Sequence, residues 1–134
     1  MIKKVEIGID KHQEVFGNPG PLGLMGLAIA TSALIPMAFG YISPDGFKST
    51  GMTAAVWALL FGGGCQFLAG IMDFANKNTF GGTIFTCFSF LWVKNAWVLY
   101  SLANGFTPDH FVEISTDFTL LLIFAVLTYG FGFF

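Results

Sequence analysis

The sequence contains little charge and no arginine. Only 10% of its 134 residues are charged, against roughly 25% in an ordinary soluble domain. Without arginine or a basic cluster, the chain has no sequence signature for binding nucleic acid. So few charged side chains cannot form the polar surface that a soluble domain of this length needs. Burial in lipid accounts better for a composition that is 54% hydrophobic and 17% aromatic.

Cysteine and histidine are also scarce, with two of each. Cys65 and Cys87 form no CxxC pair and lie far from either histidine in the sequence, so no metal site is predicted. We interpret both as small packed side chains, the usual role of a buried cysteine. His12 and His110 have no spaced second ligand or nucleophile, and glycines 62–64 lack the Lys-Ser/Thr pair of a phosphate-binding loop. We therefore expect neither an enzyme nor a bound cofactor.

Uncharged sequence, by contrast, occurs in long runs. About 20 apolar residues cross the roughly 30 Å hydrocarbon core of a bilayer as a helix. The runs predict four spanning helices, at about residues 20–42, 51–73, 79–103 and 117–134. The expected fold class is an all-α transmembrane helix bundle over residues 18–134, preceded by a polar N-terminal arm at residues 1–17. No cleaved signal peptide is indicated, because no short apolar stretch with a small-residue cleavage site stands near the start.

The lysines predict the orientation of the bundle. Lys3, Lys4, Lys11 and Lys77 would share one side of the membrane, and Lys48 the other. Because cytoplasmic loops carry the excess of lysine, we expect a multi-pass protein of the cell inner (cytoplasmic) membrane with its N-terminus in the cytoplasm. The sequence ends in a glycine- and phenylalanine-rich stretch without a polar tail. This ending suggests a truncated chain; the alternative is a four-helix protein that ends at the membrane edge.

The start of the first apolar run is the first candidate site. It contains Asn18, Pro19, Pro21 and Leu22. Proline suits the first turn of a helix, and asparagine can cap the free N–H groups there. A helix N-terminus at membrane depth presents donors and a partial positive charge, which suits an anion. The alternative is a plain helix start at the interface.

The second run carries a small-residue face with an amide at its centre. Gly62, Gln66 and Gly70 recur every four residues, with Gly63 beside them and Asp73 near the same stripe. Small residues at this spacing let helix backbones approach closely. A buried amide in lipid needs partners and tends to face the bundle interior or a water-filled path. Gln66 is interpreted either as a bridge between helices or as a donor to a carboxylate in transit.

The third run opens with Asn78 and carries a stripe of hydroxyl groups. Thr79, Thr83 and Thr86 follow one another at intervals of four and three residues. Such a stripe is compatible with the lining of a polar path. Threonine hydroxyls also bond to carbonyls of their own helix without any functional consequence, so both interpretations stay open.

Lys94 is the one charged residue inside the third run. A lysine at the centre of a spanning helix costs about 2.5–3.5 kcal/mol on insertion scales, unless its side chain extends to the interface. We expect either that extension or an attraction for anions. Trp92, Trp97 and Tyr100 nearby are typical of an interfacial aromatic belt, which favours the extension.

Together, these three clusters resemble a known family, the acetate uptake transporters (Gpr1/Fun34/YaaH; succinate–acetate/proton symporters). Residues 18–24 are similar to the family's NPxPLGL signature, and residues 61–70 to its YGGxxQxxAG stretch. Residues 78–86 are similar to its GNTFGxTxFT segment. Order and separation fit as well, and the resemblance covers nearly all of the chain after residue 17.

The resemblance implies a six-helix protomer in a homohexamer, with a substrate path through each protomer. The path would be flanked by the first motif, Gln66 and the third-helix residues. Leu27 and Phe88 align with two residues of the family's hydrophobic constriction, whose third residue lies on a fifth helix outside this chain. Asp73 stands where glutamate is more usual, and Lys94 where a small hydroxyl residue is common.

Two functions are consistent with these features. The first is a transporter or channel for acetate and related small carboxylates such as succinate, coupled to protons. Protonated acetic acid is small and partly apolar, so a lane of amide, hydroxyl and aromatic groups with few fixed charges can pass it. The second is a non-transporting membrane subunit, in which the polar groups of the second and third helices should bond one another in a dry interior.

Overall fold

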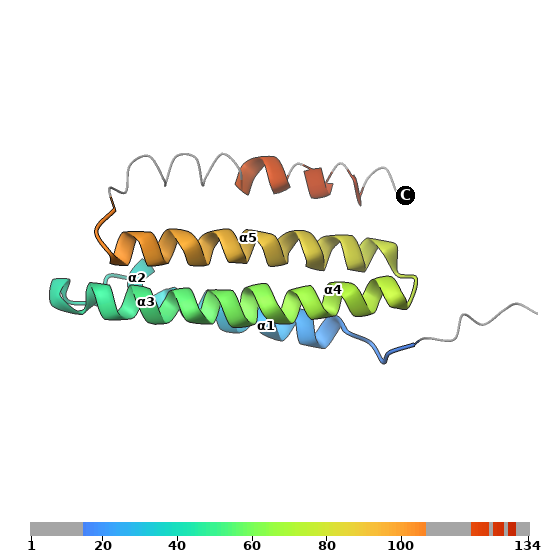
Figure 1. Cartoon of the computed structure of the whole chain (residues 1–134), viewed down its shortest axis with the longest axis horizontal. Helices are drawn as coiled ribbons and strands as arrows, with labels where there is room; N and C mark the ends of the chain where they lie inside the picture. The colour runs from blue at the N-terminus through green and yellow to red at the C-terminus, as the bar shows by residue number, and fades with distance from the viewer. Residues whose placement is uncertain (1–14, 107–118, 124, 128, 131–134) are drawn as a thin grey trace, which may run out of the picture.

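The computed structural model describes residues 15–106, 119–123, 125–127 and 129–130. Within these ranges every regular element is helical, which confirms the all-α class (Figure 1). Both histidines, most of the predicted polar arm with its three lysines, and residues 107–118 lie outside the described residues.

The predicted first span at 20–42 is divided in the structure. The helix α1 covers Gly20–Ser32, and a short helix α2 covers Ile35–Ala38. Pro36 lies in the first turn of α2, where its missing donor does no harm, whereas inside a continuous helix its ring would clash with a carbonyl one turn back. Gly40 then ends α2 with a φ of 67°, a left-handed conformation that glycine adopts readily.

The second helix of the bundle begins earlier than the predicted residue 51. A 3-10 turn, η1 (Pro44–Gly46), leads directly into α3 (Phe47–Trp57). The helix continues through a π-helical stretch, η2 (Ala58–Cys65), into α4 (Gln66–Ala75), so that these elements form one long rod (Figure 1). The earlier start follows from the proline at the first position of η1, which is pre-set for a helical turn.

The helix α5 covers Thr79–Ala103, the residues assigned to the third span, and returns alongside the long rod. The reversal is tight: the Asn78 N–H bonds to the Asp73 carbonyl, and the Lys77 N–H to the Phe74 carbonyl. Lys77 occupies the left-handed position (φ 61°) that glycine usually takes at the end of a helix. The described C-terminal pieces lie along the outer side of α5 (Figure 1).

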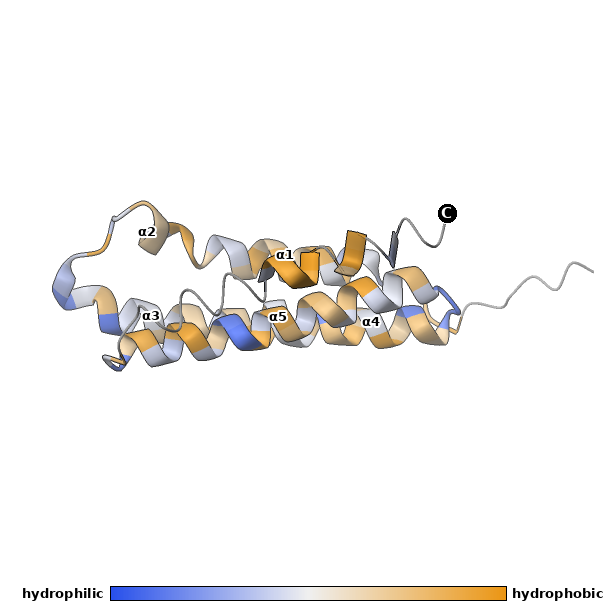
Figure 2. Ribbon diagram, turned by 90° about the horizontal axis from the view of Figure 1, so that it is seen from above, coloured by the Kyte–Doolittle hydropathy of each residue, from blue (hydrophilic) through white to orange (hydrophobic). Residues whose placement is uncertain are grey.

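The bundle packs through small side chains and exposes large apolar ones. Its core is formed by Ala30, Ala58, Trp92 and Ala96, with the partly buried Leu27, Leu34 and Leu99 against it. The outer helix surfaces are mainly apolar, and hydrophilic residues gather at the turns and in a few bands (Figure 2). Among the described residues, the stretches Gly20–Ala38 and Pro44–Ala75 are long and apolar enough to cross a membrane. The predicted total of four spans stays a prediction.

Candidate functional site

A close helix contact brings η2 and α4 against α5 through glycines. A Cβ placed on Gly62 would lie 2.6 Å from Cδ2 of the Trp92 ring, and one on Gly70 would lie 3.0 Å from the backbone N of Thr86. Only glycine fits such distances, and it allows the two helices to meet at backbone contact. We call the buried strip between them the inner seam, defined by Gln66 and Gly70 on one side and by Thr86, Ser89 and Trp92 on the other.

Gln66 lies near the middle of the inner seam. Its side chain is 2% exposed, and its Oε1 has no hydrogen-bond partner among the described residues. Gly62 and Gly70 stand four residues before and after it, or about 6 Å along the axis in each direction at 1.5 Å per residue. Gln66 therefore lies between the level of Trp92 and the level of Thr86. Since buried polar atoms in native proteins almost always have a partner, an unpartnered one calls for an explanation.

Thr86 and Trp92 add a second and a third buried polar atom without a partner among the described residues. Thr86 Oγ1 and Trp92 Nε1 are both buried without a hydrogen-bond partner in the part of the chain that the structure describes. For Trp92 the prediction of an interfacial belt is wrong, because its side chain packs on Gly62 inside the bundle. Trp97 and Tyr100 are exposed and stack on each other, with ring centroids 6.2 Å apart, as residues of a belt would be.

Ser89 is a seam residue that the sequence analysis missed. Its buried Oγ donates to the Gly63 carbonyl at 2.8 Å and so joins α5 to η2. The signal that would have found it is the spacing of Thr86, Ser89 and Trp92, which lie three residues apart and share one face of α5. The sequence analysis ended its hydroxyl stripe at Thr86 and did not extend it to Ser89.

Of the other predicted threonines, Thr83 has hydrogen-bond partners in the structure. Thr83 Oγ1 donates to the Thr79 carbonyl at 2.8 Å and lies 3.5 Å from the Tyr129 hydroxyl. Thr79 is exposed at the end of α5. Thr83 thus makes the bond within its own helix that the sequence analysis named as an alternative, and it also contacts a C-terminal piece.

The two charged residues of α4 and α5 lie at different places. Asp73 is buried, and its Oδ1 accepts from Asn78 Nδ2 at 3.0 Å at the end of the inner seam. Lys94 Nζ donates to Thr119 Oγ1 at 3.1 Å on the side of the C-terminal pieces. It lines a groove of about 360 Å³ with Cys87, Phe90, Leu91 and Leu122. In this structure the lysine therefore faces the C-terminal pieces, and the seam itself contains no cation from α4 or α5.

The first motif is attached to the same end of the bundle as Asp73. Asn18 Oδ1 accepts the Gly20 N–H at 2.9 Å, as expected of a residue that satisfies a free donor at a helix start. Pro19 is buried, whereas Pro21 and Leu22 are exposed. The preceding backbone at Phe16 exchanges two hydrogen bonds, of 2.9 and 3.0 Å, with the Asn76 side chain in the α4–α5 turn.

The two residues that the resemblance aligns with the constriction, Leu27 and Phe88, are both partly buried in the structure. Leu27 packs against the core cluster that contains Trp92. Phe88 is partly buried on α5 and is not among the residues of that cluster.

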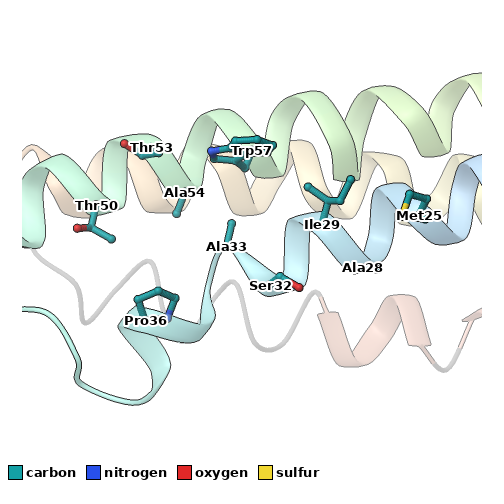
Figure 3. A pocket seen from close by; sticks show the side chains of 10 residues that line it. All are labelled: Met25, Ala28, Ile29, Ser32, Ala33, Pro36, Thr50, Thr53, Ala54 and Trp57. Atoms are coloured by element: carbon teal, nitrogen blue, oxygen red, sulfur yellow. The ribbon is translucent and has the colours of Figure 1, made fainter.

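A wider groove lies between α1, α2 and α3 (Figure 3). It has a volume of about 610 Å³ and is lined by Met25, Ala28, Ile29, Ser32, Ala33, Pro36, Thr50, Thr53, Ala54 and Trp57. Thr53 Oγ1 donates to the Ser49 carbonyl, so the hydrogen bond of this hydroxyl is already made within α3. None of the predicted site residues lines this groove, which leaves the inner seam as the better candidate site.

Asn78→Ala is expected to destabilise the end of the bundle near Asp73. Asn78 Oδ1 caps α5 by accepting the Gly81 N–H at 3.1 Å, and its amide also holds Asp73. Loss of a cap costs about 0.5–2 kcal/mol, so the variant should unfold at a lower temperature in detergent. Ser49→Ala is the control, because the Ser49 hydroxyl is exposed and bonds only within its own helix region. Equal unfolding temperatures for Asn78→Ala and wild type would contradict this role.

Comparison with known proteins supports the resemblance seen in the motifs. Residues 4–129 match the GPR1/FUN34/yaaH family. The succinate-acetate/proton symporter SatP of Escherichia coli K12 is 33% identical over 117 residues, which cover 82% of this chain and 59% of SatP. The glyoxylate pathway regulator of Yarrowia lipolytica is 36% identical over 90 residues, 65% of this chain and 31% of that protein. The ammonia transport outward protein 2 of Saccharomyces cerevisiae is 37% identical over 83 residues, 59% of this chain and 27% of that protein.

No solved structure matches the chain significantly. The chain spans less than two thirds of the length of these relatives. The expectation that it is not an enzyme is confirmed by the family, which is one of transporters. The apolar helices and the match over most of the sequence lead to one conclusion: the chain is a membrane protein and belongs to the GPR1/FUN34/yaaH family.

Proposed function

We propose that the chain takes part in moving acetate and related small carboxylic acids, such as succinate, across the cytoplasmic membrane together with a proton. The observation that carries the proposal is that two buried polar atoms of the inner seam, Gln66 Oε1 and Thr86 Oγ1, have no hydrogen-bond partner among the described residues. The symporter SatP, similar over 82% of this chain, is named for the same substrates.

The chemistry of the seam suits a neutral acid better than a carboxylate anion. A protonated carboxyl group offers one O–H donor and one carbonyl acceptor; the Gln66 amide oxygen can accept, and the Thr86 hydroxyl can do either. An unpaired anion in a seam of low dielectric constant would be strongly disfavoured. On α4 and α5 the ionisable side chains are Asp73, an acidic residue, and Lys94, which faces the C-terminal pieces. The proton would therefore cross as part of the acid.

The competing proposal, a non-transporting subunit, requires seam groups that satisfy one another. The bond from Ser89 to the Gly63 carbonyl fits that requirement. Gln66 Oε1 and Thr86 Oγ1 do not fit it, because both are buried without a partner among the described residues. Thr86 of α5 lies against Gly70, which is about one helical turn from Gln66 on α4. Leaving such groups unsatisfied costs about 1–3 kcal/mol each, which a protein evolving only for packing would avoid with apolar side chains.

Gln66→Ala should lower the uptake of labelled acetate by cells about tenfold, because a lost hydrogen bond of about 1.4 kcal/mol corresponds to that factor. Its abundance in the membrane should be unchanged. Thr86→Val should act in the same direction at nearly constant volume. Its matched control is Thr31→Val, since the Thr31 hydroxyl is exposed and bonds to carbonyls of its own helix. Wild-type uptake in both seam variants would favour the non-transporting subunit.

Acetate uptake should also increase as the external pH falls. The neutral fraction of a carboxylic acid with a pKa near 4.3 decreases about tenfold for each pH unit above that value. Transport of the neutral acid predicts rates that follow this fraction at constant total acetate. Acetate uptake should be measured between pH 5 and pH 7. Uptake of methylammonium should be measured in parallel as a probe for ammonia transport, the activity named for one relative. Rates that follow total acetate at every pH would contradict carriage of the neutral acid.

The cytoplasmic N-terminus and the homohexamer are also proposed for this chain on the basis of the lysine distribution and the family resemblance. Large apolar side chains on α1, such as Leu24 and Met25, are about 60% exposed. They provide apolar surface for lipid or for a neighbouring protomer.

A further inference from the structure

We propose that Trp92 is a specificity-determining residue, whose indole N–H donates a hydrogen bond to the carbonyl oxygen of the acid in the inner seam. The inference rests on the proposed function and adds a third substrate-contacting group to it. Trp92 stands where the polar part of the seam meets the apolar core (Ala30, Ala58, Ala96 and Leu27).

The position of the Trp92 ring is fixed by its neighbours. One face packs on Gly62, where even a Cβ would lie within 2.6 Å of the ring. The side chain is only 5% exposed and belongs to the core cluster. A side chain held in this way cannot turn its N–H towards solvent without breaking the packing of η2 on α5. The Nε1 atom nevertheless has no acceptor among the described residues.

The neighbouring seam groups do not supply an acceptor. The indole N–H is a donor only, and a buried tryptophan usually finds a partner for it. The Ser89 hydroxyl, one turn away on α5, is engaged with the Gly63 carbonyl. Gln66 lies about one turn, or about 6 Å, along the rod from Gly62, the residue that the Trp92 ring covers. A carboxyl group that enters the seam at this level has an acceptor for the Trp92 N–H and a donor for the Gln66 oxygen.

The three tryptophans allow this inference to be tested by comparison within the chain. Trp57 stacks on Phe61 with ring centroids 4.9 Å apart, and Trp97 is exposed on the outside of α5. Trp92→Phe keeps an aromatic ring in the core but removes the donor, so acetate uptake should fall about tenfold at unchanged abundance. Trp97→Phe makes the same chemical change on the same helix outside the seam and should leave uptake unchanged.

A binding measurement separates substrate contact from a role in packing. The ¹⁵N-labelled chain in detergent should give three indole N–H signals, two of which are assigned by Trp57→Phe and Trp97→Phe. Addition of acetate at pH 5 should shift the third signal, that of Trp92, and leave the other two in place. A shift that is lost in Gln66→Ala would place both groups on the same ligand.

The outcomes distinguish this inference from the proposed function. Wild-type uptake by Trp92→Phe, or a Trp92 signal that does not move under saturating acetate, overturns the inference even where uptake depends on Gln66. Absence of uptake by the wild-type chain counts against the proposed function, while the titration still decides whether Trp92 binds the acid. If Trp92→Phe fails to accumulate in the membrane, the titration of the wild-type chain decides alone.

Discussion

Gly26→Ala should separate α1 from η2 and lower the stability of the bundle more than the other single substitutions considered above. A Cβ on Gly26 would lie 2.5 Å from the Phe61 carbonyl oxygen and 2.7 Å from the Cys65 Cβ. The first of these is a backbone atom, so no change of rotamer relieves the clash and the helices have to move apart. Overpacking a tight contact typically costs about 1–3 kcal/mol and occasionally more; we expect about 3 kcal/mol here.

The measurement is the unfolding temperature of the purified protein in detergent, together with its abundance in the membrane. Gly64→Ala is the matched control, because a Cβ there meets only the Leu59 carbonyl oxygen, at an ordinary 3.9 Å. The control should unfold at or slightly above the wild-type temperature, since alanine is the better helix former. If both variants unfold at the same temperature, α1 does not pack on η2 as described.

Gly23→Ala should destabilise the contact between α1 and α5, and a second substitution should repair it. A Cβ on Gly23 would lie 2.6 Å from Cδ1 of the Phe85 ring. We expect a loss of about 1–3 kcal/mol. In the double variant Gly23→Ala/Phe85→Leu, the smaller side chain makes room for the added methyl group, so most of the lost stability should return.

The Phe85→Leu variant alone completes a double-mutant cycle with this pair. Residues in direct contact show coupling energies of about 0.5–3 kcal/mol, whereas distant residues are additive. A coupling near zero would show that the first motif does not pack against the third. This cycle tests the packing of two segments whose likeness to the family was recognised from the sequence alone.

The sequence alone indicated that the chain is surrounded by lipid and that its fold is all-α. Fourteen charged residues in 134, arranged to leave long apolar runs, are compatible with helices in lipid because each helix satisfies its own backbone. The family could also be recognised from the sequence, since its motifs are short contiguous segments such as residues 18–24. Gln66 was identified in the same way, because an amide in an apolar run needs hydrogen-bond partners wherever the helix packs, and burying it without them costs free energy.

The roles of Trp92, Ser89 and Lys94 depended on the tertiary structure. Trp92 and Trp97 lie five residues apart on one helix, and sequence reasoning placed both in an interfacial belt. Only the packing of Gly62 against α5 shows that Trp92 is buried while Trp97 is exposed. Periodicity identifies which residues share a face of a helix, but which face meets a glycine on another helix depends on contacts between residues distant in sequence. That is why the tertiary structure was needed to assign Trp92 to the seam.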